Sequence, residues 1–276
     1  MDLLMIIKAI ILGLVEGLTE FAPVSSTGHM IIVDDMWLQS EKFLTQHGAN
    51  TFKIVIQLGS ILAVVVTFKD RFIDLLGLGH FKTKATSGQG RLKLSQVIVG
   101  LIPAGVLGVL FNDYIDEHLF STATVLVGLV IGAILMMLAD FFGPKHPKVQ
   151  TVDQITYKQA LTVGLFQCFS LWPGFSRSGS TISGGVLMGM SHRAAADFTF
   201  IMAVPIMAGA SFLSLLKNWE YMTLDALPIF IAGFISAFIF ALLSIRFFLK
   251  LINKIKLLPF AIYRIVLALL LYIIFF

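Results

Sequence analysis

The sequence predicts an all-α integral membrane protein with six spanning helices plus two re-entrant helical hairpins in an inverted repeat. Composition is the first reason: of 276 residues, 57% are hydrophobic and only 13% are charged, whereas soluble domains carry about 25% charged residues. The second reason is a series of apolar runs long enough to cross a bilayer. The third is a pair of interrupted apolar segments that are similar to one another in sequence.

Six apolar runs are long enough to span a bilayer, which takes roughly 20 helical residues. They are residues 50–68, 94–111, 121–142, 195–216, 226–249 and 257–276. The residues between them are too few for a soluble domain, so we expect a single membrane domain over 1–276. The N-terminus lacks the charged region and small-residue cleavage site of a signal peptide, and we expect none.

Two further apolar regions, 1–37 and 157–190, are each interrupted in the middle by polar residues, glycine and proline. Each is expected to form two short half-helices joined by a non-helical turn. Such backbone is tolerated at membrane depth only where protein buries it or where it lines a wet cavity. The two regions are therefore predicted to be re-entrant hairpins.

The two hairpins have matching sequences. The stretch GLVEGLTEFAPVSSTGH, from Gly13, aligns without a gap with GLFQCFSLWPGFSRSGS, from Gly164. The aligned pairs include Glu16 with Gln167, Thr19 with Ser170, Ser25 with Ser176, Ser26 with Arg177 and Gly28 with Gly179. Each hairpin is followed by three spans, and an odd number reverses the direction of the second copy. The halves 1–142 and 157–276 are thus predicted to be inverted repeats with a site near the midplane.

The positions of lysine and arginine predict the orientation, because these residues concentrate on the cytoplasmic side. The loop NDYIDEHLF at 112–120 carries neither of them. The other loops carry Lys69, Arg71, Lys82, Lys84, Arg91 and Lys93, then Lys145, Lys148 and Lys158, then Lys250, Lys254 and Lys256. The alternation is self-consistent and places both termini outside the plasma membrane. The first hairpin would enter from outside and the second from inside, and 77–93 is expected to be a flexible linker.

Two glutamates in the first hairpin are the first candidates for chemistry. Glu16 and Glu20 are four residues apart, so a helix places both on one face, with Thr19 beside them. Two carboxylates ~4 Å apart at an effective dielectric near 20 repel by about 4 kcal/mol. The pair is expected to share a proton, meet a cation or bind a metal. The alternative is that one is protonated and hydrogen-bonded to the opposite hairpin.

The stretch that follows the glutamates suits an anion. Pro23 is predicted to end the first half-helix. The second half-helix then starts near Ser25, Ser26 and Thr27, and its free N–H groups and positive dipole end favour an anion. One of the two serines is expected to cap the helix. His29 is either a base in the same site or a hydrogen-bonded interior histidine.

The second hairpin contains a cation, Arg177, whose planar guanidinium group suits phosphate or carboxylate. The hydroxyl residues that frame it are Ser176, Ser178, Ser180 and Thr181. The alternative is a salt bridge from Arg177 to one of the glutamates that serves only the fold. Two other polar residues lie within spans. Gln57 either faces the site or makes a helix-to-helix hydrogen bond, and Arg264 is expected to snorkel or pair near the cytoplasmic end.

Together, two facing helix N-termini, an arginine and several hydroxyls predict a phosphate site. The carboxylates would repel phosphate unless a hard divalent cation, Mg²⁺ or Ca²⁺, lies between them. A site within lipid that opens at the outer face implies a lipid substrate with a phosphorylated head group. The net charge of +4 is modest, and we expect no nucleic-acid partner. The rival interpretation is an inverted-repeat transporter or flippase, in which the same ionisable groups relay protons.

The stretches EGLTEFAPVSSTGH at 16–29, IQLGSILAV at 56–64 and PGFSRSGST at 173–181 resemble the undecaprenyl-diphosphate phosphatase family of bacteria, the bacitracin-resistance proteins. The resemblance implies metal-dependent hydrolysis of undecaprenyl diphosphate to the monophosphate and phosphate at the outer face, by a homodimer with an inverted-repeat fold. It also implies recycling of the cell-wall lipid carrier.

Carried onto this chain, the family's glutamate motif falls on Glu16 and Glu20, its serine–histidine motif on Ser26 and His29, and its phosphate-binding motif on Ser176 and Arg177. One hypothesis has Ser26 attack the terminal phosphorus while Glu20 or His29 accepts its proton, with Arg177 stabilising the equatorial oxygens. Glu16, alone or with Glu20, would hold the metal. A second hypothesis makes His29 the nucleophile and Ser26 a phosphate ligand, and the sequence leaves both open.

Overall fold

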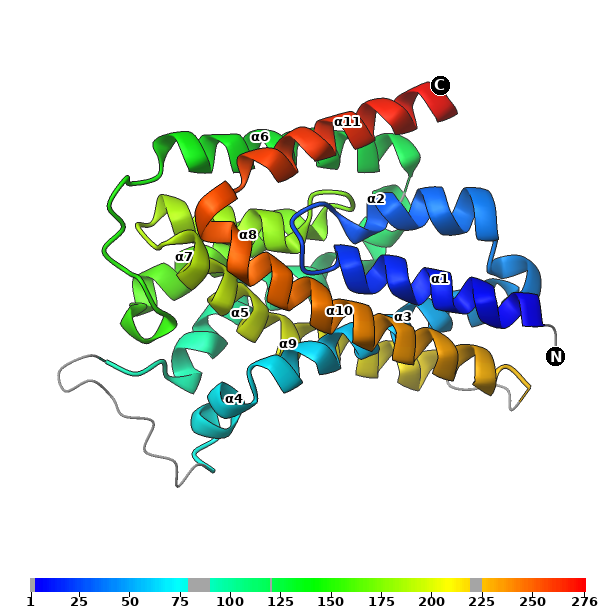
Figure 1. Ribbon diagram of the computed structural model, residues 1–276, viewed down its shortest axis with the longest axis horizontal. Helices are drawn as coiled ribbons and strands as arrows, with labels where there is room; N and C mark the ends of the chain where they lie inside the picture. The colour runs from blue at the N-terminus through cyan, green and yellow to red at the C-terminus, as the bar shows by residue number, and fades with distance from the viewer. Residues whose placement is uncertain (1–2, 79–89, 120, 219–224) are drawn as a thin grey trace.

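The computed structural model describes residues 3–78, 90–119, 121–218 and 225–276. Within these ranges the chain is helical apart from its turns and one isolated β-bridge between Val149 and Met190. The long helices run roughly parallel or antiparallel in one bundle (Figure 1). The predicted all-α class is confirmed for this part of the chain.

Six helices of the described residues are long and apolar enough to cross a membrane, as predicted. They are α3 (Glu41–Thr67), α5 (Leu94–His118), α6 (Thr122–Phe142), α9 (His192–Asn218), α10 (Leu227–Ile255) and α11 (Leu258–Phe275). Three boundaries differ from the prediction by six residues or more. Helix α10 continues to Ile255 rather than 249, and α3 begins at Glu41 rather than at 50. Helix α5 continues through His118, so most of the predicted loop 112–120 is helical. That stretch has neither proline nor glycine to end the helix.

Each interrupted region forms helices on either side of a turn. The first consists of α1 (Leu3–Thr19), α2 (Ser26–Met30) and the π-helix η1 (Ile31–Leu38). The second consists of α7 (Tyr157–Gln167), the 3₁₀ segment η3 (Cys168–Leu171) and α8 (Arg177–Leu187). The first half-helix ends at Thr19, whose carbonyl the ring of Pro23 would meet in a continued helix.

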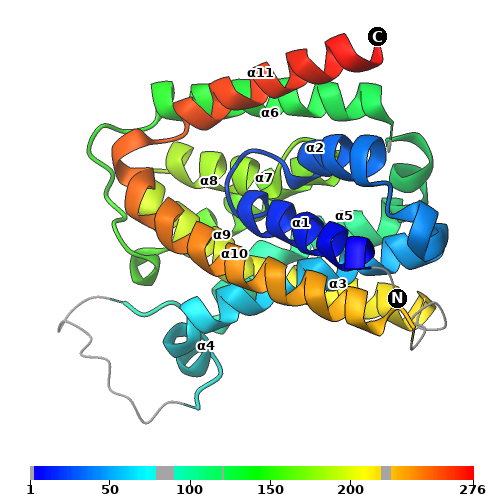
Figure 2. The same cartoon turned by 45° about the vertical axis from the view of Figure 1, so that its right-hand side comes forward.

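The two N-terminal half-helices pack against spans of the other half of the chain. Helix α1 lies along α10, and α7 lies along α5 (Figure 2). In both pairs the backbones meet at glycines: a Cβ on Gly13 would collide with the carbonyl of Gly233, and a Cβ on Gly164 with that of Gly100. Small residues of this kind permit the close van der Waals packing on which helix association in membranes depends. Each hairpin is thereby fixed to the opposite half.

The central helix of the fold is α8, which contacts α6, α7 and α9. Its residues from Ser178 to Val186 are all buried. Phe21, in the first turn, is fully buried and meets Phe200 of α9 edge to face at 5.2 Å. The turns of the two hairpins therefore meet inside the bundle and not at its surface.

The two ends of the described chain lie at the same end of the bundle (Figure 1). The opposite end holds three segments that carry cationic residues, namely α4 (Lys69–Leu75), 143–156 and the link between α10 and α11. Arg71 pairs there with Asp153 at 2.8 Å. Lys82, Lys84 and most of the predicted linker 77–93 lie outside the described residues.

Candidate active site

The turns of the two hairpins have the same local structure. Ser25 and Ser176 each adopt a positive φ, 71° and 72°, a conformation that costs free energy for a residue with a Cβ. Ser25 Oγ accepts a hydrogen bond from Gly28 N, and Ser176 Oγ accepts one from Gly179 N. Each serine thus caps the helix that follows it. The prediction that one serine of the first hairpin caps the helix is confirmed for Ser25, so the hydroxyl of Ser26 is not used for capping.

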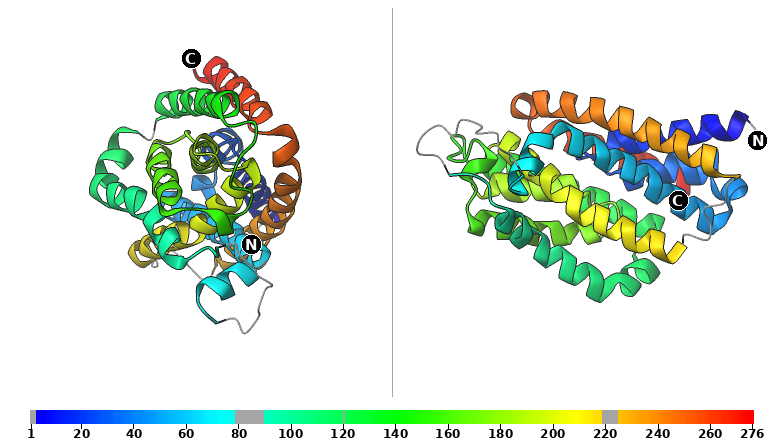
Figure 3. Two further views of the ribbon diagram at one scale, coloured as in Figure 1. Left: turned by 90° about the vertical axis from the view of Figure 1, so that its left-hand side faces the viewer. Right: turned by 90° about the horizontal axis from the view of Figure 1, so that it is seen from below.

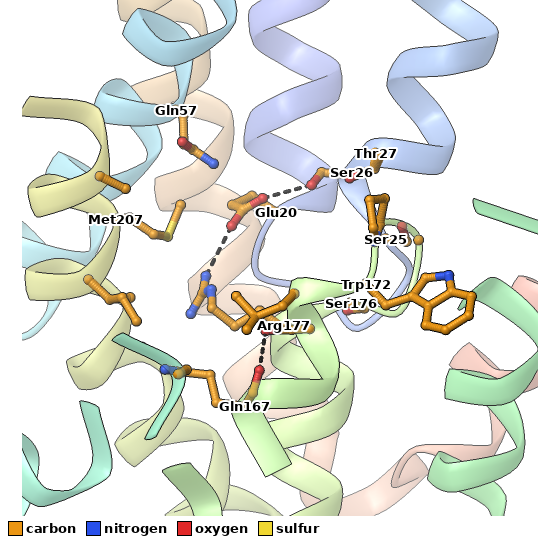
Figure 4. Close-up of a pocket in the computed structure, with 17 residues that line it drawn as sticks. Glu20, Ser25, Ser26, Thr27, Gln57, Gln167, Trp172, Ser176, Arg177 and Met207 are labelled. Carbon is orange, nitrogen blue, oxygen red and sulfur yellow. Dashed lines mark hydrogen bonds and ion pairs between the residues drawn. The ribbon is translucent and has the colours of Figure 1, made fainter. Parts of the chain in front are cut away.

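Glu20 joins the two hairpins. Ser26 Oγ donates a 2.7 Å hydrogen bond to Glu20 Oε2, and Arg177 Nη2 forms a 3.0 Å ion pair with Glu20 Oε1 (Figure 4). Both charged side chains are largely buried, so the pair interacts in surroundings of low dielectric constant. A carboxylate in this position can accept the serine proton while the guanidinium holds it in place.

Arg177 has capacity left for a ligand. Its Nη1 is buried and has no hydrogen-bond partner among the described residues. The ring of Phe21 lies 5.9 Å from the guanidinium carbon, and this cation–π contact holds its plane. A buried guanidinium with one free N–H edge suits an oxyanion, because an unpaired donor of this kind is costly without one.

A cavity of about 290 Å³ lies beside these groups. Its polar lining comes from both hairpins and from α3: Glu20, Ser25, Ser26, Thr27, Gln57, Gln167, Ser170, Ser176 and Arg177 (Figure 4). Most of the residues predicted from sequence to bind phosphate or to act in catalysis are therefore brought together. Gln57 faces this cavity, which was one of the two alternatives for it.

Three predicted residues lie elsewhere. Ser178 Oγ donates to the carbonyl of Ala22, and Thr181 Oγ1 donates to the carbonyl of Arg177 at 2.7 Å. His29 Nδ1 contacts the carbonyl of Ser25, and its Nε2 contacts the hydroxyl of Tyr263 at 2.7 Å. None of the three lines the cavity. These hydrogen bonds connect the two turns, hold the first turn of α8 and tie α2 to α11.

Glu16 faces a second, larger cavity of about 500 Å³. The helix ends at Thr19, so Glu20 lies just beyond it and the two carboxylates line different cavities. Ser26, Thr27 and Gln57 line both, so the cavities adjoin. Glu16 is 5% exposed, and its Oε1 has no partner among the described residues.

A divalent cation has two candidate ligands here, Glu16 and Glu20. Among the described residues no group of three or more His, Cys, Asp or Glu side chains could hold a metal alone. Mg²⁺, however, is commonly bound through one or two carboxylates together with substrate phosphates. The unpartnered oxygen of Glu16 fits that mode of binding.

Gln167 is a residue of this site that the sequence argument did not select. It is 1% exposed, and neither atom of its amide group has a hydrogen-bond partner among the described residues, although it lines the smaller cavity. A buried amide without hydrogen-bond partners costs free energy. Its alignment with Glu16 could have identified it, because the aligned positions face the adjoining cavities from opposite hairpins.

The prediction for Arg264 is wrong. The side chain is 0% exposed, so it does not snorkel to the surface of the protein. Its Nη2 donates to the carbonyls of Gly128 and Gly174, at 3.1 and 2.9 Å. Gly174, with a φ of +87°, lies in the turn just before Ser176. Arg264 therefore holds the second turn against α6, and the indole of Trp172 adds a 2.8 Å hydrogen bond to the carbonyl of Thr124.

The chain is similar to known proteins along nearly its whole length. The family model described as "Bacitracin resistance protein BacA" matches residues 9–270. Relatives named undecaprenyl-diphosphatase include one from Geobacillus sp. (strain WCH70), 79% identical over the whole of both chains. Another, from Bacillus subtilis (strain 168), is 64% identical over 263 residues, 95% of each chain. The match to the family model covers nearly the whole chain, including both turns and the residues around Glu20, and the chain belongs to the BacA family of bacitracin resistance proteins.

Proposed function

We propose that this protein hydrolyses undecaprenyl diphosphate to undecaprenyl phosphate and inorganic phosphate, which recycles the lipid carrier and lowers sensitivity to bacitracin. The observation that carries the proposal is the position of Glu20 between Ser26 and Arg177 on the wall of the smaller cavity. The names of the full-length relatives support the same reaction. The bundle of six apolar helices supports a substrate that arrives within the membrane.

In the first step, Ser26 Oγ attacks the terminal phosphorus. Its proton passes to Glu20, which already accepts its hydrogen bond at 2.7 Å. The bond between this phosphorus and the bridging oxygen breaks, and undecaprenyl phosphate leaves with that oxygen. The free N–H edge of Arg177 binds the equatorial oxygens, where phosphoryl transfer needs most of its stabilisation.

In the second step, water attacks the phosphoserine. Glu20, having passed its first proton to the departing lipid phosphate, accepts one proton of this water, and the serine oxygen takes it back as inorganic phosphate forms. The positions of the side chains favour Ser26 over His29 as the nucleophile, since His29 is held by Ser25 and Tyr263 outside the cavity lining.

Glu16 and Glu20 are the residues that would hold Mg²⁺ or Ca²⁺ in this proposal. When bound, such a cation neutralises charge on the diphosphate oxygens. Glu16 supplies a buried carboxylate oxygen without a partner among the described residues, and Glu20 supplies a carboxylate fixed by Arg177. Calcium or magnesium is preferred over softer ions because the available donors are oxygen atoms.

We also propose that the halves 1–142 and 157–276 form an inverted repeat with two re-entrant hairpins. Support comes from the matching conformations of Ser25 and Ser176, and from the matching glycine contacts of α1 on α10 and α7 on α5. The distribution of cationic residues supports a site open to the outer face. A homodimer belongs to the same proposal on the resemblance alone. Cysteine accessibility from each side of the membrane tests the topology, and light scattering tests the dimer.

The decisive experiment measures phosphate release from undecaprenyl diphosphate by purified protein in detergent, with and without a chelator. Release that requires a divalent cation and is lost in Glu20→Gln would support the proposal. Arg246→Lys, on an exposed face of α10, serves as the control variant. Folded protein that releases no phosphate with added Mg²⁺ or Ca²⁺ would contradict it.

A further inference from the structure

The helix pair α3 and α10 is packed more closely than α9 and α5, the pair at the corresponding position of the proposed repeat. Helix α3 packs along much of α10, whereas α9 and α5 contact one another over a much shorter stretch. The buried residues of α3 extend from Leu44 to Val64, and those of α10 from Ile229 to Ile252. Within the described residues the bundle is therefore closed between α3 and α10 and more open between α5 and α9.

The opening lies between the second halves of α5 and α9. Ala104 is the last buried residue of α5, and beyond it the described side chains are partly or fully exposed. On α9, Met207 and Ser211 are buried, whereas Gly209 and Ala210 between them are exposed. In the view from below, α5 lies at the margin of the molecule next to α9 (Figure 3, right).

The sequence accounts for this divergence. Pro103 and Pro205 lie inside α5 and α9, and a proline within a helix removes a backbone hydrogen bond and bends it. Gly105 follows Pro103 by two residues, and Gly209 follows Pro205 by four. A Cβ on either glycine would meet no described atom within 4 Å. Both helices thus leave unfilled space beside them at corresponding points.

Residues of the same two helices line the candidate active site. The wall of the smaller cavity opposite the two turns is apolar and comes from these two helices: Ala104, Ile206, Met207 and Ala210. Ala104 and Met207 are buried, whereas Ala210 is exposed at the surface of α9. The cavity therefore has a polar side that suits a diphosphate and an apolar side that extends to the exposed Ala210 of α9.

We propose that the first isoprene units of the substrate lie between the second halves of α5 and α9, in a tail subsite bounded by Ala104, Met207 and Ala210. The inference rests on the proposed function, because it takes the substrate to be a polyprenyl diphosphate. The small side chains at 104 and 210 leave room for a branched hydrocarbon. The diphosphate reaches Arg177 and Ser26 while the rest of the tail remains in the bilayer.

Photochemical labelling of the unmodified protein tests this placement. The probe is an undecaprenyl diphosphate analogue that carries a diazirine in its first isoprene units. We expect labelled peptides from 94–118 and 192–218, with labelling suppressed by unlabelled substrate. Labelling confined to other helices, or the absence of suppressible labelling in protein that releases phosphate, would overturn the tail subsite. Protein that releases no phosphate at all would instead remove the proposed function.

A substitution gives the second test. Ala210→Trp fills the subsite, so the KM for undecaprenyl diphosphate should rise by at least about tenfold while kcat changes by less than about twofold. The inhibition constant of inorganic phosphate should stay unchanged, because the polar side of the cavity is intact. Leu243→Trp, at an exposed position of α10, is the matched control. An Ala210→Trp enzyme with the KM of the unmodified protein would contradict the proposal.

Discussion

Ser26 Oγ donates a 2.7 Å hydrogen bond to Glu20 Oε2 across a single turn. Glu20 is the first residue after α1, and Ser26 is the first residue of α2. The turn between them returns on itself because Ser25 adopts a positive φ and caps α2. Backbone conformation therefore aligns the two groups that we propose as proton acceptor and nucleophile, one at each end of a single turn.

Replacing Ser26 should abolish turnover. Ser26→Ala removes the hydroxyl that attacks phosphorus, and we expect kcat to fall by on the order of 10³-fold or more. Thr162→Ala, a hydroxyl outside both cavities, is the control and should retain activity. Phosphate release by both purified variants is the measurement. A Ser26→Ala enzyme with near-normal turnover would eliminate the serine nucleophile.

The stability of the covalent intermediate separates serine from histidine. A phosphoserine survives acid and is cleaved by base, whereas a phosphohistidine is cleaved by acid. Rapid quenching of the enzyme with terminally ³²P-labelled substrate should therefore yield acid-stable label. We expect that label on the peptide that contains Ser26, since the Nε2 of His29 is held by the hydroxyl of Tyr263. Acid-labile label on His29 would reverse the assignment.

Arg177 should not be replaceable by lysine. Its guanidinium binds Glu20 with one nitrogen and leaves Nη1 for the substrate, whereas an ammonium is a single point charge that cannot make the same fork. We expect Arg177→Lys to lower kcat/KM by at least about 100-fold, because charge-assisted hydrogen bonds contribute about 1.5–3 kcal/mol each. Steady-state kinetics beside Arg246→Lys measure the difference. An Arg177→Lys enzyme within about threefold of normal would contradict this role.

Replacing Gln167 with methionine should raise the stability of the protein and weaken its binding of substrate. Its amide has no partner among the described residues, so Gln167→Met removes a buried unsatisfied group and should raise the thermal midpoint. The amide also lines the cavity that we propose for the diphosphate. Gln167→Met removes this hydrogen-bonding group, and we expect the KM to rise by about two- to tenfold. Gln167→Glu should raise it further by repulsion. A Gln167→Met enzyme that is less stable and equally active would show that the amide serves only the fold.

The sequence predicted the turns better than it predicted the contacts between distant segments. Pro23, the capping serines and the alignment of the hairpins are local features, and local chemistry decides them. The alignment of Glu16 with Gln167 indicated equivalent positions, but only the ending of α1 at Thr19 separates Glu16 from Glu20 into different cavities. The Tyr263 partner of His29 and the partners of Arg264 come from segments far away in the chain, which helical periodicity does not specify.

Arg264 provides the last prediction, because its role is positional. The guanidinium satisfies the carbonyls of Gly128 and Gly174 in the bundle interior. Arg264→Met keeps an unbranched side chain but leaves the buried carbonyl of Gly174 without this donor, which costs about 1–3 kcal/mol. The loss should lower the thermal midpoint.

Because Gly174 lies in the turn that precedes Arg177, the Arg264→Met variant should also lower kcat by about tenfold or more through displacement of Arg177. Arg264→Lys, which retains a hydrogen-bond donor, should recover part of the thermal midpoint and part of kcat. The inhibition constant of inorganic phosphate distinguishes positioning from mere unfolding, since folded Arg264→Met enzyme should bind phosphate more weakly. Folded variant with unchanged phosphate inhibition and unchanged kcat would show that the second turn keeps its shape without Arg264, and that the hydrogen bond from Trp172 to Thr124 is sufficient to hold it.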